Sequence, residues 1–272
     1  MAVAVRLPAV AVLALAGVVP VVRAGEIVSR EPPIYSAASI VTAANSLPGP
    51  LSPNCIATIY GKNLAWTTRA LLSEDIRGGQ ELPTVLAGTG VRVTFGDILA
   101  NVYFVSPAQI NFLVPPNLKP GNHRVYVSLD GLAGPEVTVR LLEASPGLFQ
   151  TSDSAVVATH SSGELIVAEN PARPGETIVI YAAGLGPTSP RQKYGFLVKT
   201  PAQIDHITDL QLTAGGMPVP LDQVDYAGVT PGFAGLYQIN LRLPDGVPEN
   251  PDMRVWIGEQ ASPEGVRLPL VR

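Results

Sequence analysis

The side chains that most often carry out chemistry are few in this chain and lie far apart in it. The histidines are His123, His160 and His206, and they show no His-x-x-x-His spacing. Cys55 is the sole cysteine, so neither a Cys/His zinc motif nor an internal disulfide is available. Ser161-Ser162, next to His160, reads as a hairpin tip rather than the strained elbow of a nucleophile. The sequence therefore predicts no metal site and no cofactor.

Carboxylates are the remaining candidates for catalysis. Two acids facing each other about 5 to 9 Å apart would be suited to glycoside hydrolysis. Solvated loop residues are the simpler interpretation, and we predict no catalytic residue. A secreted hydrolase using loop carboxylates stays as an alternative. The acids concerned are Asp205, Asp209, Asp222 and Asp225.

The clearest hydrophobic pattern in the chain has a period of two residues, which indicates β-strands. We therefore expect strands to position the candidate side chains. The stretch 109–115 (QINFLVP) recurs as 238–244 (QINLRLP), with an apolar residue at every second position. We expect a half-buried strand in each case. Its other face carries Gln109 and Asn111, or Gln238 and Asn240. These amides either bind a glycan or peptide or tie down a neighbouring loop, and their duplication favours the structural role.

Other segments recur in the same order. Residues 53–64 resemble 174–185 at a shift of 121, which aligns Tyr60 with Tyr181, and the shift at the Gln-Ile-Asn strands is 129. A repeat kept in order with small loop insertions indicates two copies of one domain. Short alternating strands and frequent turns predict an all-β fold of two tandem β-sandwich domains, each made of two sheets. We place them at residues 36–143 and 150–272.

Residues 144–149 form the predicted linker, in which Leu148 and Phe149 are expected to pack at the joint between the domains. The second copy has six more residues between Tyr226 and Gln238 than the first has between Tyr103 and Gln109. This insertion carries Phe233 between glycines. The candidates for ligand contact are therefore Phe233, Tyr226 and Tyr237. The alternative for Phe233 is a structural plug at the domain joint.

The N-terminus has the pattern of an export signal. Residues 1–24 join Arg6, an apolar run and small residues before a cleavage site, and residues 25–35 form a polar leader. An uncleaved N-terminal anchor is the alternative. Cleavage would change the net charge from −4 to −6, because Arg6 and Arg23 are lost. An acidic chain is a poor partner for nucleic acid. We expect a secreted or cell-surface protein with no membrane span in the mature chain.

Several motifs carry a resemblance to a known family. They are Asn170–Glu176 (NPARPGE), Pro231–Asn240 (PGFAGLYQIN), Tyr103–Asn111 (YFVSPAQIN) and Ser145–Phe149 (SPGLF). Together they resemble the uncharacterised C-terminal domain family of acidobacterial proteins of the Solibacter type. The resemblance covers residues 36 to 272 and implies an all-β fold of two tandem immunoglobulin-like (IPT/TIG-like) β-sandwich domains without known catalytic residues. Residues 53–55 (PNC) depart from the Pro-Gly that is common there.

The sequence thus favours a secreted, non-catalytic module for extracellular binding, adhesion or assembly. Its partner would be an extracellular protein or a glycan. A rigid structural spacer is the other alternative, and it differs from the binding module in having no ligand.

Overall fold

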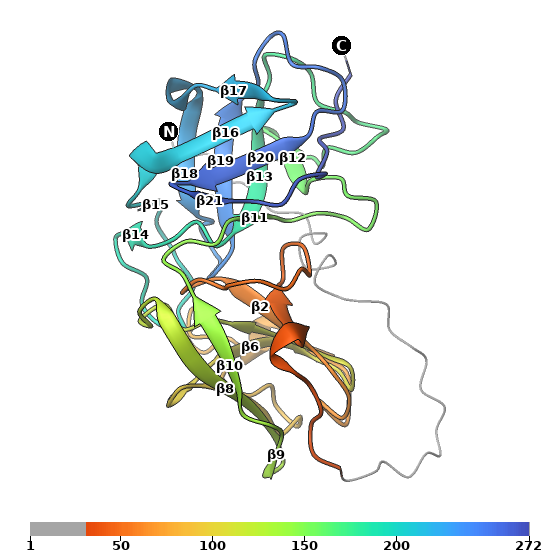
Figure 1. Cartoon of the computed structure of the whole chain (residues 1–272), viewed down its shortest axis with the longest axis vertical. Coiled ribbons are helices and arrows are strands. Elements are labelled where there is room, and N and C mark those ends of the chain that lie inside the picture. Colours follow the sequence, from red (N-terminus) through yellow and green to blue (C-terminus); the bar gives the residue numbers. More distant parts are fainter. Residues whose placement is uncertain (1–30, 272) are drawn as a thin grey trace. The chain divides into compact units, whose positions relative to one another are not determined.

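The computed structural model describes residues 31–271, whose regular elements are strands and short 3-10 turns (Figure 1). The predicted signal peptide lies outside the described residues. Within residues 31–271 no helix is long and apolar enough to cross a membrane. The described chain divides into two compact units. The first comprises residues 31–143 with Lys193–Leu197, and the second Ala144–Gln192 with residues 198–271.

The first unit is built from two antiparallel sheets. One has the strand order β1-β2-β7-β6-β3 and the other β10-β8-β4-β5, with β9 paired to β8. The elements are η1 (Ala37–Ser39), β1 (Ile40–Thr42), β2 (Ile56–Tyr60), β3 (Arg69–Ala70), η2 (Ser73–Asp75), β4 (Val91–Phe95), β5 (Ile98–Leu99), β6 (Asn101–Val105), β7 (Gln109–Leu113), β8 (Gly121–Leu129), β9 (Leu132–Ala133) and β10 (Val137–Leu141).

The core of the first unit lies between these sheets. Phe95 of β4 and Phe112 of β7 are fully buried, and their ring centroids are 6.4 Å apart. Ile59 and Ile110, which are paired across β2 and β7, share the inner face with Phe112. The alternation of apolar residues therefore faces the opposite sheet, as in a sandwich.

The second unit repeats this plan. One sheet has the order β11-β13-β19-β18-β15-β14, with β12 also paired to β13, and the other has the order β17-β16-β20-β21. The elements are β11 (Gly147–Leu148), β12 (Ala158–His160), β13 (Thr177–Ala183), β14 (Thr188–Ser189), β15 (Ala202–Ile204), η3 (Ile207–Asp209), β16 (Leu210–Ala214), β17 (Met217–Val219), η4 (Leu221–Gln223), β18 (Val224–Val229), β19 (Tyr237–Arg242), β20 (Met253–Ile257) and β21 (Gln260–Ala261).

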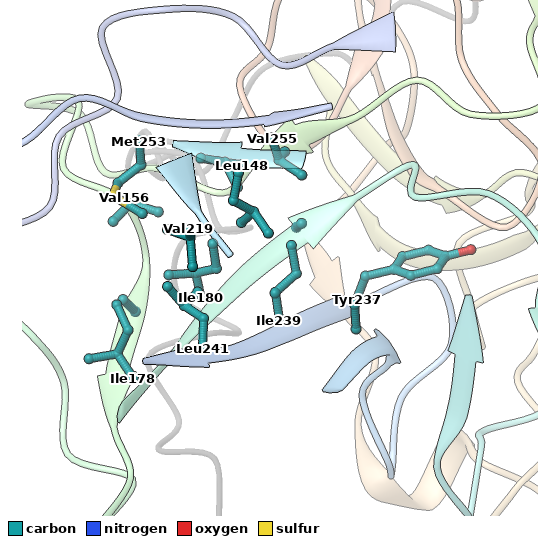
Figure 2. Packing of buried hydrophobic residues seen from close by; sticks show 14 of the residues in the cluster. Leu148, Val156, Ile178, Ile180, Val219, Tyr237, Ile239, Leu241, Met253 and Val255 are labelled. Atoms are coloured by element: carbon teal, nitrogen blue, oxygen red, sulfur yellow. The ribbon is translucent and has the colours of Figure 1, made fainter. Parts of the chain in front are cut away.

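Its core joins the inner faces of the two sheets (Figure 2). Ile180 of β13 and Ile239 of β19 come from the larger sheet, and Val255 of β20 comes from the smaller one. All three are fully buried. At about 1.5 to 3 kcal/mol for each large apolar side chain removed from water, this core is a main source of stability.

The two units share register as well as strand order. Tyr60 pairs with Gln109 between β2 and β7, and Tyr181 pairs with Gln238 between β13 and β19. The next strand pair in each unit, β6 with β7 and β18 with β19, has a β-bulge at the corresponding position. The bulge lies opposite Phe112 and Asn111 in the first unit and opposite Leu241 and Asn240 in the second. A bulge is an inserted residue that is usually retained within a family.

The bulges correct one sequence-based alignment. Phe104, rather than Tyr103, lies opposite Asn111, as Tyr226 lies opposite Asn240. The extra residue on the bulged strand is Tyr103 in the first unit and Asp225 in the second. Counted from Phe104 and Tyr226, the insertion before Gln238 is seven residues rather than six. A bulge shifts the count by one without changing the residue types, so sequence matching alone aligned the two tyrosines.

The prediction of half-buried Gln-Ile-Asn strands is wrong for the first unit. In β7 the outward-facing Asn111 and Leu113 are as deeply buried as Ile110 and Phe112. Thr58 of the neighbouring strand is also buried on this outer face. The polar residues at alternate positions therefore mark a covered polar layer rather than a solvated surface.

Candidate functional site

The repeated amides bond within their own strands. Gln109 Nε2 donates to Asn111 Oδ1 at 2.9 Å, and Gln238 Nε2 donates to Asn240 Oδ1 at 2.8 Å. Asn111 Oδ1 also accepts from Thr58 Oγ1 at 3.0 Å. Asn111 is fully buried, whereas Asn240 is half-buried. These bonds can tie adjacent strands and residues together, and in the first unit they leave Asn111 no surface for a ligand.

The repeated tyrosines have different environments. The Tyr60 ring is exposed and its hydroxyl lies 3.1 Å from Ser46 Oγ. Tyr181 is buried, and burial raises the pKa of its phenol. The tyrosine at this strand position is therefore exposed in the first unit and buried in the second.

Tyr237 is not a ligand-contact residue in this fold, contrary to expectation. Its side chain is fully buried in the core of the second unit, and its hydroxyl donates to Gly186 O at 2.6 Å (Figure 2). The alternation of β19 contained this signal, because Tyr237 is two positions before Ile239 and shares its face.

Tyr226 is half-buried, and its hydroxyl is engaged in the backbone of β15 and β18. It accepts from Ala202 N at 3.1 Å and lies 2.7 Å from Val229 O. The hydroxyl also approaches Gly228 so closely that a Cβ there would lie 2.5 Å from it. The position of Tyr226 thus depends on a glycine, and its phenol works as a brace between strands.

Phe233 is held in a defined loop of the second unit. Its carbonyl accepts from Val198 N at 3.0 Å, and its amide donates to Thr230 O at 3.1 Å. Gly232 and Gly235 adopt positive φ angles of 88° and 73°, which glycine tolerates best. The ring is half-buried. The loop is therefore preorganised, and a ligand role for Phe233 stays a prediction.

The residues predicted at the domain joint are both buried. Leu148 belongs to β11, pairs with Ala182 and packs in the core of the second unit. Phe149 follows it, and its amide donates to Tyr181 O at 3.0 Å. Leu148 thus has an evident role in the second unit, and the joint role of the two residues stays a prediction.

Glu176 organises the Asn170–Glu176 motif. One of its oxygens lies 2.5 Å from His160 Nδ1, and the other accepts from Arg173 N at 3.0 Å. The second ring nitrogen of His160 lies 3.2 Å from Asn170 O. Both ring nitrogens thus lie within hydrogen-bonding distance of an oxygen. The arrangement fixes the loop before β13 and presents no nucleophile.

Two of the acids considered for hydrolysis lie beside basic side chains. Asp205 forms an ion pair with Arg191 at 2.9 Å, and Asp209 lies 3.4 Å from His206. Asp222 and Asp225 are exposed. Among residues 31–271 no group of three or more His, Cys, Asp or Glu side chains is arranged to hold a metal ion.

A surface that the sequence reasoning did not select lies on the smaller sheet of the second unit. Trp256 of β20 faces outward and is half-buried, and the exposed Gln211 of β16 is directly opposite it. The guanidinium of Arg254 lies over the indole, 4.6 Å from the ring centroid. We call these three residues the Trp256 face.

Arg254 is fixed on this face. Its Nη1 bonds Glu264 Oε1 at 2.6 Å, and its Nη2 donates to Ser262 O at 3.0 Å. The indole is therefore braced by a cation that is itself held on both sides, a geometry in which cation–π attraction is favourable. The pattern Arg-x-Trp on one strand face was the available sequence signal.

The first unit has a looser counterpart. Tyr126 of β8 is half-buried, and Arg124 two positions before it shares its face of the strand. Arg124 reaches Glu136 at 3.6 Å with both side chains largely exposed, whereas the Arg254 side chain is 23% exposed. The two units therefore share the pattern but differ in the aromatic residue and in how firmly its arginine is held.

Comparison with known proteins identifies part of the chain. Residues 39–140 match the IPT/TIG domain family. No match was found among curated proteins. The chain thus contains an IPT/TIG domain, and its fold is all-β and immunoglobulin-like.

Solved structures of low similarity include two surface glycan-binding proteins. One is SGBP-B of the Bacteroides ovatus mixed-linkage glucan utilization locus, in complex with a heptasaccharide, at 13% identity and a TM-score of 0.32 over 82% of this chain and 43% of that protein. The other is PbSGBP-B of Prevotella bryantii, at 12% identity and a TM-score of 0.26 over 86% and 41%. Domains 5–6 of the S-layer protein SbsC give 9% identity and a TM-score of 0.28 over 88% and 98%. This chain spans less than half of the first two proteins.

Proposed function

We propose that this chain is an exported, non-catalytic binding module made of two immunoglobulin-like sandwiches, and that the Trp256 face is its contact surface. The observation that carries the proposal is the braced indole. Trp256 is half-buried on the outside of a sheet, with Arg254 fixed over it and the amide of Gln211 opposite. Tryptophan and arginine are the residue types that most often dominate binding energy at interfaces.

The rigidity of this face favours binding. A side chain that is already ordered loses little conformational freedom when a ligand arrives. Arg254 is held by Glu264 and Ser262, so neither it nor the indole beneath it needs to be immobilised. The ring offers apolar surface, and Gln211 offers both a donor and an acceptor. An extracellular glycan or protein would use both kinds of contact.

The test is binding of the chain from Gly25 onward to arrays of extracellular glycans and of secreted proteins. We expect a ligand whose affinity falls at least tenfold in Trp256→Ala and less in Trp256→Phe. Trp66→Phe is the matched control, because Trp66 is another half-buried tryptophan, which belongs to the first unit and whose Nε1 bonds Asp130 at 3.0 Å. A ligand that binds wild type and Trp256→Ala equally would contradict the assignment. The absence of any ligand would favour the spacer.

Export and duplication belong to the same proposal. We infer that residues 1–24 are a signal peptide, so N-terminal sequencing of the mature protein should begin near Gly25. A cytoplasmic protein beginning at Met1 would contradict this. The shared register of Tyr60/Gln109 and Tyr181/Gln238, together with the matching bulges, supports a duplicated unit. The resemblance to the Solibacter-type family is a proposal that rests on the motifs given above.

A further inference from the structure

One short segment from the second half of the chain belongs to the first unit. This segment is Lys193–Leu197, which we call the strap. Leu82 N donates to Gly195 O at 2.7 Å, and Leu197 N donates to Gln80 O at 2.8 Å. These two bonds flank an antiparallel bridge between Glu81 and Phe196. The strap therefore pairs with residues 80–82 as an added strand does.

The segment that receives the strap is prepared on both sides. Glu81 is already bridged to Arg77 on its other side, by Arg77 N donating to Glu81 O at 3.0 Å and Glu81 N donating to Arg77 O at 2.9 Å. Asn101 of β6 is buried and donates from Nδ2 to Leu82 O at 2.8 Å. Residues 80–82 are thus anchored to the first unit, and the strap occupies their remaining edge.

The fit of the strap is specific at Gly195. This residue has a φ of +72°, and a Cβ there would lie 3.0 Å from both Nδ2 and Oδ1 of Asn101. The backbone therefore comes as close to Asn101 as a glycine allows. Next to it, Phe196 carries Lys193 Nζ 3.6 Å from its ring centroid. In the strap, Gly195 thus lies close to Asn101, and the aromatic residue Phe196 follows it.

We propose that residues 80–82 form a strand-acceptor edge, and that its occupant is the strap of the same chain. The first unit is then completed by a segment about fifty residues beyond the end of its own sequence at Glu143. An acceptor of this type recognises an extended backbone through main-chain bonds and reads side chains at alternate positions. This inference is independent of the Trp256 face and of any ligand bound there.

A covalent test uses the bridged pair. Paired residues without direct hydrogen bonds have Cα atoms about 4.5 Å apart, a separation that a disulfide spans. The double substitution Glu81→Cys with Phe196→Cys should therefore cross-link on mild oxidation of the folded full chain, seen as the loss of two free thiols. Glu136→Cys with Phe196→Cys is the control. Glu136 directly precedes β10, which belongs to a different sheet from β6, the strand that carries Asn101. Failure of the bridged pair to cross-link in folded protein would overturn the proposal.

A second test uses matched glycines. Gly195→Ala adds a Cβ against Asn101, whereas Gly79→Ala has a similar φ of +68° and meets nothing within 4 Å. We expect amide exchange of Leu82 to rise at least tenfold in Gly195→Ala and much less in Gly79→Ala. Equal exchange in the two variants would contradict the specific fit.

A peptide competition identifies the occupant. A synthetic peptide of residues 192–199 (QKYGFLVK) should bind the Gly195→Ala chain and restore protection at Leu82, while binding wild type at least tenfold more weakly. A peptide that binds wild type as well as the variant would show that the edge is open and overturn the assignment. An intermolecular disulfide in place of the intramolecular one would instead assign the edge to a second copy and equally overturn it.

Discussion

Gln109 donates its side-chain amide to Asn111 two positions along the same strand, and Asn111 accepts a second bond from Thr58 of the neighbouring strand. Three polar side chains thereby interact on one sheet face, where Thr58 and Asn111 are buried. The bond between Thr58 and Asn111 favours one register, because a slip of one residue between β2 and β7 would separate these two buried side chains.

Asn111→Ala is expected to destabilise the first unit by about 1 to 3 kcal/mol, because it leaves the Thr58 hydroxyl and the Gln109 amide without this partner. Asn240→Ala removes the equivalent acceptor at a half-buried position, so the loss should be smaller. Urea unfolding of both variants measures the difference. A larger loss at Asn240 would contradict the burial argument.

Two tyrosines allow a matched test of buried hydroxyls. Burial raises the pKa of both Tyr35 and Tyr194 to about 12. The Tyr35 hydroxyl donates to Pro135 O at 2.5 Å and accepts from Val127 N at 2.8 Å. The Tyr194 hydroxyl is buried and has no hydrogen-bond partner among the described residues.

Tyr35→Phe should therefore cost about 1 to 3 kcal/mol, whereas Tyr194→Phe should be neutral or stabilising by up to about 1 kcal/mol. Thermal and urea unfolding of the two variants in parallel provide the measurement. If Tyr194→Phe destabilised as much as Tyr35→Phe, its hydroxyl would have to be bonded.

Cys55 gives a pH dependence. Burial raises the pKa of its thiol from 9.0 to about 11. An unfolded chain would therefore lose this proton first as pH rises. The contribution of the protonated Cys55 thiol to the stability of the folded state is fully present below pH 9 and is lost as pH rises through about 11. At about 1.4 kcal/mol per pKa unit, the loss attributable to Cys55 is on the order of 3 kcal/mol.

Cys55→Ala removes this ionisation, so the stability difference between wild type and variant should narrow between pH 9 and 11. Urea unfolding at pH 7, 9 and 10 measures the difference in the free energy of unfolding between the two proteins. Ionisation of the buried tyrosines affects both proteins equally and so cancels in this difference. A constant difference across this range would show that the thiol ionises normally in the folded protein.

The linker residues permit a comparison of neighbours. Leu148→Ala should lower the stability of the second unit by about 2 to 5 kcal/mol, because Leu148 lies in its core. Phe149→Ala tests the proposed domain joint. We expect one calorimetric transition to become two, with the stability of each unit retained. A single unchanged transition would show that Phe149 does not couple the domains.

Periodicity predicted the strands well because side-chain direction alternates in every strand. The strand expected in residues 109–115 is β7, and the strand expected in residues 238–244 is β19. The same alternation placed Ile239 and Leu241 in the core. It also placed Tyr237 there, so its selection as a surface residue disregarded information that the sequence contained.

Other features lay beyond a period-two pattern. Burial of Asn111 depends on what covers the outer sheet face, which is a tertiary property. The bulge beside Tyr226 inserts one residue without a distinctive residue type. The fixed position of Arg254 over the Trp256 indole depends on Glu264 and Ser262, which both lie outside β20. Contacts between segments that are far apart in sequence cannot be read from local spacing.

The strap changes how this protein can be divided. A fragment that stops at Glu143 lacks Gly195 and Leu197, and would expose the amide of Leu82 and the carbonyl of Gln80. Such an open edge is a template for pairing with other chains, the usual start of β-type aggregation. A fragment of residues 25–143 should therefore precipitate at concentrations at which the whole chain stays in solution, whatever its hydrophobic core contributes.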